Sequence, residues 1–156
     1  MVTQGGDSKE RAALSALDLP EFFGLDDLVA GVEWSRATSI EVVEFRGIYP
    51  GDGLFGIWLS TGCGDYILHA PAASELHRRQ IVLHELAHMI LGHDLAAGQS
   101  SAAALFPDLP EEVVLRFLAR GHADNAMERE AEALADLLAS LLRRNRRHSS
   151  FVRVFG

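Results

Sequence analysis

The chain has 156 residues, of which 48% are hydrophobic, so it has the size and composition of one globular domain with its own core. Its 22 acidic residues against 14 basic ones give a net charge of −8, which disfavours the broad cationic surface that nucleic-acid binding requires. The single cysteine, Cys63, cannot form an internal disulfide, and no apolar run approaches the roughly 20 residues that span a bilayer.

From these properties we expect a cytoplasmic protein without direct nucleic-acid or membrane partners. No basic and apolar leader pattern opens the chain, so we expect no signal peptide. A single domain is expected over residues 1–156, with segments 1–7 and 146–156 as its flexible ends.

The first part of the chain predicts two helices. Asp7 and Glu10 form a capping-box pattern that predicts the start of a short amphipathic helix, closed by Leu19-Pro20. A second helix is predicted after Pro20. The residues available for its buried side are Phe23, Leu25, Leu28, Val29 and Val32.

The next part predicts a small sheet. Segments 40–45, 54–60 and 65–69 are rich in β-branched and aromatic residues, which is typical of strands. Gly-containing turns separate them at 50–53 and 61–64. Short turns favour neighbouring strands that run in opposite directions, so we expect a three-stranded antiparallel meander.

Beyond Pro71 the pattern is helical. Ser74 can cap a helix that runs from residue 75 to Leu91 and ends at Gly92. Residues 95–108 predict a surface loop, and a short helix is expected from Leu109. A long helix is predicted from about Ala126 to Arg143, and the whole reads as an α+β domain.

The strongest chemical signal is His84-Glu85-Leu86-Ala87-His88, inside the predicted helix 75–91. Histidines four residues apart project from one face of a helix, so both imidazoles can reach one zinc ion. Glu85 lies about 100° around the helix, where it can act as general base towards water at the open position of the metal. The flanking segment 80–91 is apolar almost all round, and two buried histidines beside a glutamate need a functional reason.

A catalytic zinc site needs a third protein ligand. On the predicted helix 126–143, Glu128 and Glu130 flank opposite edges of the apolar stripe, so periodicity alone does not choose between them. Glu132 follows Glu128 by one turn, and a second carboxylate at this spacing can orient a ligand imidazole. We therefore expect Glu128 as the ligand and Glu132 behind it, against the alternative of a solvated acidic face.

Two other histidines are weaker candidates. The pattern H-E-x-x-H-x-x-G-x-x-H would need Gly and His at positions that hold Leu91 and Asp94. His93 is therefore expected to be a polar residue at the helix end, where it can cap the helix. His77 precedes His84 by about two turns, roughly 10 Å, which is too far to share a metal ion.

Taken together, these residues resemble the ImmA/IrrE family of metallopeptidases. The resemblance spans about residues 10–142 and rests on His84-Glu85-Leu86-Ala87-His88 with Leu91-Gly92-His93, and on the later Glu128-x-Glu130-Ala131-x-x-Leu134-Ala135. It implies a zincin-like domain whose third zinc ligand is Glu128. It also implies a protein substrate, since family members typically cleave a helix-turn-helix transcriptional repressor.

The chain departs from the family pattern at several positions. Ala87 stands where Gly is usual, which a helix tolerates. Glu132 stands where Asn or Asp is usual, and Leu134 replaces Phe. The Met-Pro that commonly follows the distal helix is missing. These departures lie outside the expected ligand set.

The leading hypothesis is a zinc-dependent endopeptidase that acts on one intracellular protein, with Glu85 as its general base. The runner-up is a regulatory protein that uses a zincin-like fold to bind a partner, with little or no peptidase activity. A structural zinc site is a third hypothesis, and it is disfavoured because Glu85 beside an open position has no structural task.

Two further segments have alternative interpretations. Strand residues 54–59 can form a sheet edge beside the cleft, where an extended substrate could add as a strand. The basic run 143–148 predicts a solvated helix end that complements the helix dipole. Docking of an acidic partner is the alternative for this run.

Overall fold

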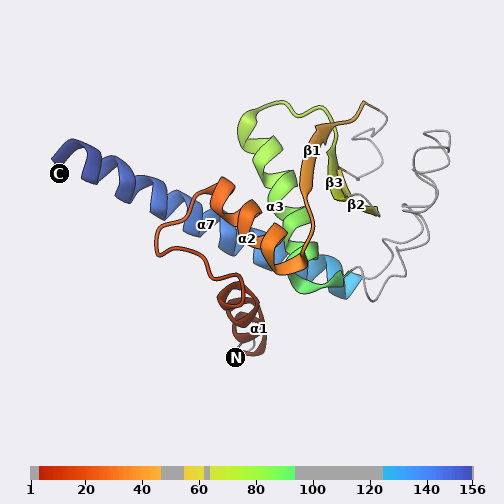
Figure 1. Cartoon of the computed structure of the whole chain (residues 1–156), viewed down its shortest axis with the longest axis horizontal. Helices are drawn as coiled ribbons and strands as arrows, with labels where there is room; N and C mark the ends of the chain where they lie inside the picture. Colours follow the sequence, from red (N-terminus) through yellow and green to blue (C-terminus); the bar gives the residue numbers. More distant parts are fainter. Residues whose placement is uncertain (1–3, 47–54, 62–63, 94–124, 156) are drawn as a thin grey trace.

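The computed structural model of the protein describes residues 4–46, 55–61, 64–93 and 125–155, which form a mixed α+β arrangement of four helices and a small sheet (Figure 1). The predicted α+β class is therefore confirmed. The loop predicted over 95–108 and the helix predicted from Leu109 lie outside the described residues. The elements are α1 (Gln4–Ser15), α2 (Leu25–Arg36), β1 (Ile40–Glu44), β2 (Gly56–Thr61), β3 (Gly64–His69), α3 (Glu75–Leu91) and α7 (Asn125–Phe155).

The sheet has the order β1-β3-β2, which differs from the predicted meander. β2 and β3 form the expected antiparallel pair, with Gly56 opposite His69. β1 instead pairs with β3 in parallel, with Ile40 opposite Asp65, so the antiparallel prediction for β1 was wrong. The physical reason is the long connection 45–55, which does not force β1 and β2 to be neighbours as a tight hairpin turn would.

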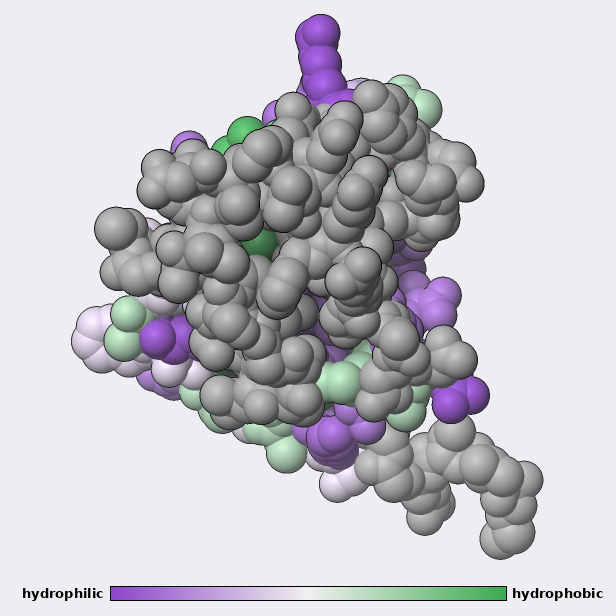
Figure 2. Space-filling model, turned by 90° about the vertical axis from the view of Figure 1, so that its right-hand side faces the viewer, coloured by the Kyte–Doolittle hydropathy of each residue, from purple (hydrophilic) through white to green (hydrophobic). Residues whose placement is uncertain are grey.

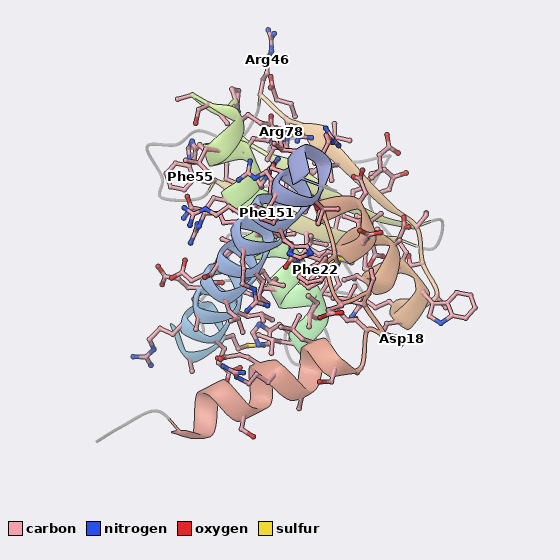
Figure 3. All side chains as sticks on the ribbon, turned by 90° about the vertical axis from the view of Figure 1, so that its left-hand side faces the viewer. Asp18, Phe22, Arg46, Phe55, Arg78 and Phe151 are labelled. Carbon is pink, nitrogen blue, oxygen red and sulfur yellow. The ribbon has the colours of Figure 1, made fainter. Side chains whose placement is uncertain are left out.

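α3 occupies the centre of the structure, between the sheet and α7 (Figure 1). In the view along α7 from its C-terminal end, α2 lies on one side of α7 and Phe55 on the other, while α1 crosses below (Figure 3). One core cluster joins these elements, because each turns a hydrophobic face towards α3. Its fully or nearly fully buried members include Leu28, Val32, Trp58, Ile67, Leu86, Met89, Leu134 and Leu138.

The two faces of the sheet contribute to different clusters, as the two-residue period of a strand requires. Ile67 of β3 packs into the main cluster, whereas its neighbour Leu68 packs with Ile57 and Leu59 in a second one. Both faces are therefore buried, so the short strands are held in register by side chains as well as by hydrogen bonds.

Both ends of α3 follow the sequence prediction. The hydroxyl of Ser74 accepts a hydrogen bond from the backbone N–H of His77 at 3.1 Å, which caps the N-terminus. Gly92 ends the helix in the left-handed conformation, at φ +70°, and its N–H bonds to the carbonyls of His88 and Met89. Glycine suits this position because other residues are strained at positive φ.

The N-terminal helices agree with the prediction in part. α1 begins at Gln4, so Asp7 lies inside the helix and the predicted capping-box start was wrong. α2 follows Pro20 as expected and buries Leu28 and Val32. At its end, Arg36 donates a hydrogen bond to the carbonyl of Met89 at 3.0 Å, which fastens α2 to α3.

α7 starts one residue before the predicted Ala126 but continues to Phe155, so the predicted end near Arg143 was wrong. Asn145 supports the extension, because its buried side-chain N–H donates to the carbonyl of Phe23 at 2.9 Å. The basic run 143–148 therefore lies within the helix. Residues 146–155, expected as part of a flexible end, are helical and reach beyond the other elements (Figure 1).

The end of the molecule that carries the strands and the start of α7 is seen in Figure 2, where the coloured residues include hydrophilic areas and small hydrophobic areas, some of them strongly hydrophobic. No helix among the described residues combines the length and hydropathy that a membrane span requires.

The close approach of β2 to α3 yields a stability prediction for Gly56. A Cβ atom at this position would lie 2.5 Å from Ile81 Cγ2 and 3.0 Å from Glu85 Oε1. We expect Gly56→Ala to lower the free energy of unfolding by about 1–3 kcal/mol, measured by urea denaturation. Gly24→Ala is the control, because its Cβ would meet nothing closer than 3.7 Å, and it should cost under about 1 kcal/mol. Equal losses in the two variants would contradict the close approach.

Candidate metal centre

The site forms where the last turns of α3 meet the first turn of α7. His84 and His88 project from one face of α3, one turn apart, and Glu128 reaches them from α7. Ala87 on α3 and Ala131 on α7 are completely buried in the same core cluster. Such small side chains let two helices approach closely, so a carboxylate on one helix can reach imidazoles on the other.

Three side chains converge on one point. His84 Nε2 lies 3.2 Å from His88 Nε2 and 3.1 Å from Glu128 Oε2, and His88 Nε2 lies 3.2 Å from Glu128 Oε1. Nitrogen and oxygen ligands about 2.0–2.1 Å from a tetrahedral zinc ion would stand roughly 3.3 Å apart. The observed separations are close to this value, so His84, His88 and Glu128 could hold a metal ion.

The charges of the site favour a bound cation. Burial lowers the pKa of His84, but the hydrogen bond to Glu128 and the charges of Glu85, Glu128 and Glu132 outweigh it and raise the pKa above its ordinary value. Hydrogen bonds from His84, the larger effect, and from His88 hold the pKa of Glu128 far below its usual range. Glu128 therefore stays ionised, and the site attracts either a proton or a metal ion.

A cleft of about 450 Å³ opens beside the three converging side chains. That volume lies within the range of small-molecule and cofactor sites. Glu85 is 3% exposed and lines this cleft together with His84 and Glu128. Gly56 has no side chain, and this leaves room for the carboxylate of Glu85. A Cβ atom at Gly56 would lie only 3.0 Å from Glu85 Oε1. The remaining lining residues are Phe55, His77, Gln80, Ile81, Glu132, Ala135 and Asp136.

Glu132 was predicted to orient a ligand imidazole from behind Glu128. In the structure Glu132 is exposed and lines the cleft, and among the described residues it makes no hydrogen bond to either imidazole. Its contribution to the site is its charge, which helps to raise the pKa of His84. His77 is likewise outside the converging set, as predicted, and its ring meets Phe55 edge to face in the cleft wall.

His93 differs most from its predicted role as a polar cap at the helix end. It is buried, and its Nδ1 lies 2.8 Å from Nδ1 of His88. On its other side, His93 Nε2 lies 3.2 Å from Glu130 Oε2. Glu130 is in turn held by Lys9 of α1, whose Nζ lies 3.0 Å from both carboxylate oxygens.

These residues extend the site beyond the predicted set. Burial lowers the pKa of His93, and the hydrogen bond from Lys9 is the largest of the effects that lower the pKa of Glu130. The left-handed turn at Gly92 explains how His93 folds back onto His88. That glycine was the one signal in the sequence for this contact, since a helix that continued straight would carry His93 away from His88.

Comparison with protein-family models, with curated proteins and with solved structures finds no match to this chain. A function is therefore inferred from the residues of the site and their arrangement.

Glu128→Ala tests the ligand set directly. Removing one of three ligands should weaken zinc binding by about 100-fold or more, measured by competition with a chromophoric chelator. Glu132→Ala removes the same kind of side chain from the same helix without removing a ligand, and we expect a loss of less than about tenfold. Equal losses in the two variants, or full zinc content in Glu128→Ala, would contradict the assignment of Glu128.

The raised pKa of His84 predicts a pH dependence of zinc binding. Zinc needs the unprotonated imidazole, so below the pKa of His84 each zinc ion must displace a proton. This pKa lies above 6.5, so zinc affinity should begin to fall before the pH has been lowered to 6.5. In more acidic solution the loss should approach about tenfold per pH unit. Glu128 adds no such loss there, since its pKa is far lower. Equal affinity at about pH 5.5 and 8 would contradict proton competition at His84.

Proposed function

We propose that this protein is a zinc-dependent endopeptidase with a zincin-like fold, related to the ImmA/IrrE metallopeptidases that its motifs resemble. The observation that carries the proposal is the convergence of His84, His88 and Glu128 beside a cleft that Glu85 also lines. Two imidazoles and a carboxylate around an open side form the ligand type of many zinc hydrolases. A closed structural site would use a fourth protein ligand and would need no cleft.

Bound zinc would supply a Lewis acid that polarises the scissile carbonyl and brings the pKa of the attacking water near 7. The chain itself supplies Glu85 as the proton acceptor. Its buried carboxylate would take a proton from the attacking water as the new C–O bond forms. The same proton would then pass to the leaving amine as the C–N bond breaks, which leaves one new carboxyl group and one new amine.

The position of β2 supports a peptide as the substrate. Among the described residues, β2 has a strand neighbour on one side only, so it lies at an edge of the sheet. Phe55 and Gly56, at the start of this strand, line the cleft. An extended peptide could add its backbone to this edge and so lie across the site. The edge position matches the expectation for strand residues 54–59 over residues 56–59, and addition of a substrate strand there is part of the proposal.

The natural substrate we propose is a helix-turn-helix transcriptional repressor in the cytoplasm. This part of the proposal rests on the family resemblance, and its test is co-expression with helix-turn-helix proteins encoded beside this chain. Cleavage of one of them, at one position and only with intact His84 and His88, is the expected result. Binding without cleavage would favour the alternative of a regulatory protein that uses this fold to recognise a partner.

Glu85→Gln separates catalysis from metal binding. The variant keeps the size of the side chain and all three ligands, so zinc affinity should stay within about threefold of the wild type. Cleavage should fall by about 10²–10⁴-fold, because an amide cannot accept the proton from water. Rates are to be measured at saturating zinc on a peptide or protein that the wild type cleaves. A variant that retains more than about a tenth of the wild-type rate would exclude Glu85 as the general base.

A further inference from the structure

A chain of four side chains runs from the surface of α1 to the metal-facing side of α3. Lys9 contacts Glu130, Glu130 contacts His93 Nε2, and the two Nδ1 atoms of His93 and His88 lie 2.8 Å apart. His88 Nε2, at the far side of the same ring, faces the point where the three ligand atoms converge. Each contact is within hydrogen-bond distance, so the donor and acceptor roles along the chain depend on one another.

The roles can be assigned from the surface inwards. The ammonium of Lys9 only donates and the ionised carboxylate of Glu130 only accepts, so His93 must present N–H at Nε2. A neutral imidazole that carries its proton on Nε2 has a lone pair on Nδ1. Two nitrogen atoms 2.8 Å apart share one proton between them, so His88 must supply the N–H at its own Nδ1. His88 Nε2 also lies 3.2 Å from Glu128 Oε1, and an ionised carboxylate favours a proton on that nitrogen. The contact with His93 opposes this preference and favours the lone pair on Nε2, where a metal ion needs it.

We infer that His93 is a positioning residue that, together with Glu130 and Lys9, fixes the Nδ1–H tautomer of His88 and so prepares its Nε2 to bind the metal. The inference rests on the proposed function for the identity of the metal. In metal sites a ligand imidazole commonly donates its second N–H to a carboxylate or a carbonyl group. Here the imidazole of His93 lies between His88 and the carboxylate of Glu130. Because His93 donates to Glu130 through Nε2, its Nδ1 is left to accept from His88.

This series of side-chain contacts also explains why α1 packs where it does. Lys9 and Glu130 are far apart in the sequence, and their ion pair joins α1 to the first turns of α7. The side chains of Lys9 and Glu130 are 58% and 40% exposed, so the pair contributes little to stability by itself. Its role in the inferred chain is to keep Glu130 ionised and directed towards His93.

The first test is zinc affinity in three variants, measured by chelator competition at about pH 8. His93→Leu should weaken zinc binding by about 10–100-fold, because His88 loses its fixed tautomer. His93→Gln can accept from His88 through its carbonyl oxygen and donate to Glu130 through its amide, so it should stay within about threefold of the wild type. His148→Leu removes a histidine on the same helix as Glu130, away from the site, and should leave the affinity unchanged.

Glu130→Ala provides a variant at a half-exposed position, where folding is not at risk. It should weaken zinc binding by about tenfold, because His93 is free to turn its proton towards His88. Glu21→Ala removes an exposed carboxylate elsewhere and controls for the change of net charge. Circular dichroism on every variant establishes that each one is folded.

The second test reads the tautomer itself. In ¹⁵N NMR spectra of the metal-free protein at about pH 8, His88 should be an Nδ1–H tautomer in the wild type and in His93→Gln. In His93→Leu the His88 imidazole should become a mixture of the Nδ1–H and Nε2–H tautomers. A residue with a purely structural role would not produce this change, and the spectrum does not depend on catalytic activity.

Two results would overturn the inference. One is zinc affinity in folded His93→Leu within threefold of the wild type. The other is an unchanged His88 tautomer in that variant. Failure of the proposed function is distinguishable, because it would be seen as absent zinc binding in the wild type, while the NMR experiment on the metal-free protein would still report on His93.

Discussion

The contact between α3 and α7 is the constraint on which the rest of the structure depends. The two helices are distant in the sequence, and the site exists only because buried small and branched residues hold them close together. Glu128 would otherwise face water as an ordinary surface acid. The same contact brings Glu130 to His93, so one packing arrangement determines both the converging ligand atoms and the residues behind them.

The remaining elements complete that arrangement from three sides. The sheet also packs on α3, and the bare backbone of Gly56 leaves room for the carboxylate of Glu85. Arg36 fastens α2 to the carbonyl of Met89, near the end of α3. α1 reaches the site through Lys9. The buried side chains of His88, His93 and Glu85 are tolerated because none of their polar atoms is left buried without a hydrogen-bond partner.

The sequence predicted best those features that depend on residues close together in the chain. Helical spacing placed His84, Glu85 and His88 correctly on one helix, and Ser74 and Gly92 marked its ends. Glu128 could be favoured over Glu130 only through its neighbours and a family motif, since both lie at edges of one apolar stripe. The parallel pairing of β1 with β3 and the contact of His93 with His88 depend on how distant segments meet. No periodicity within one segment encodes such contacts, and the end of α7 was misjudged because its partner Phe23 lies far away in the chain.

The central claim is that His84, His88 and Glu128 bind a zinc ion. X-ray absorption spectroscopy of the zinc-loaded protein tests it most directly, because it reports the ligand types and distances without a substrate. We expect two imidazole nitrogens and further oxygen ligands at about 2.0–2.1 Å, with no sulfur. A sulfur ligand at about 2.3 Å, which only Cys63 or a methionine could provide, or a shell of oxygen atoms without imidazole, would contradict the assignment.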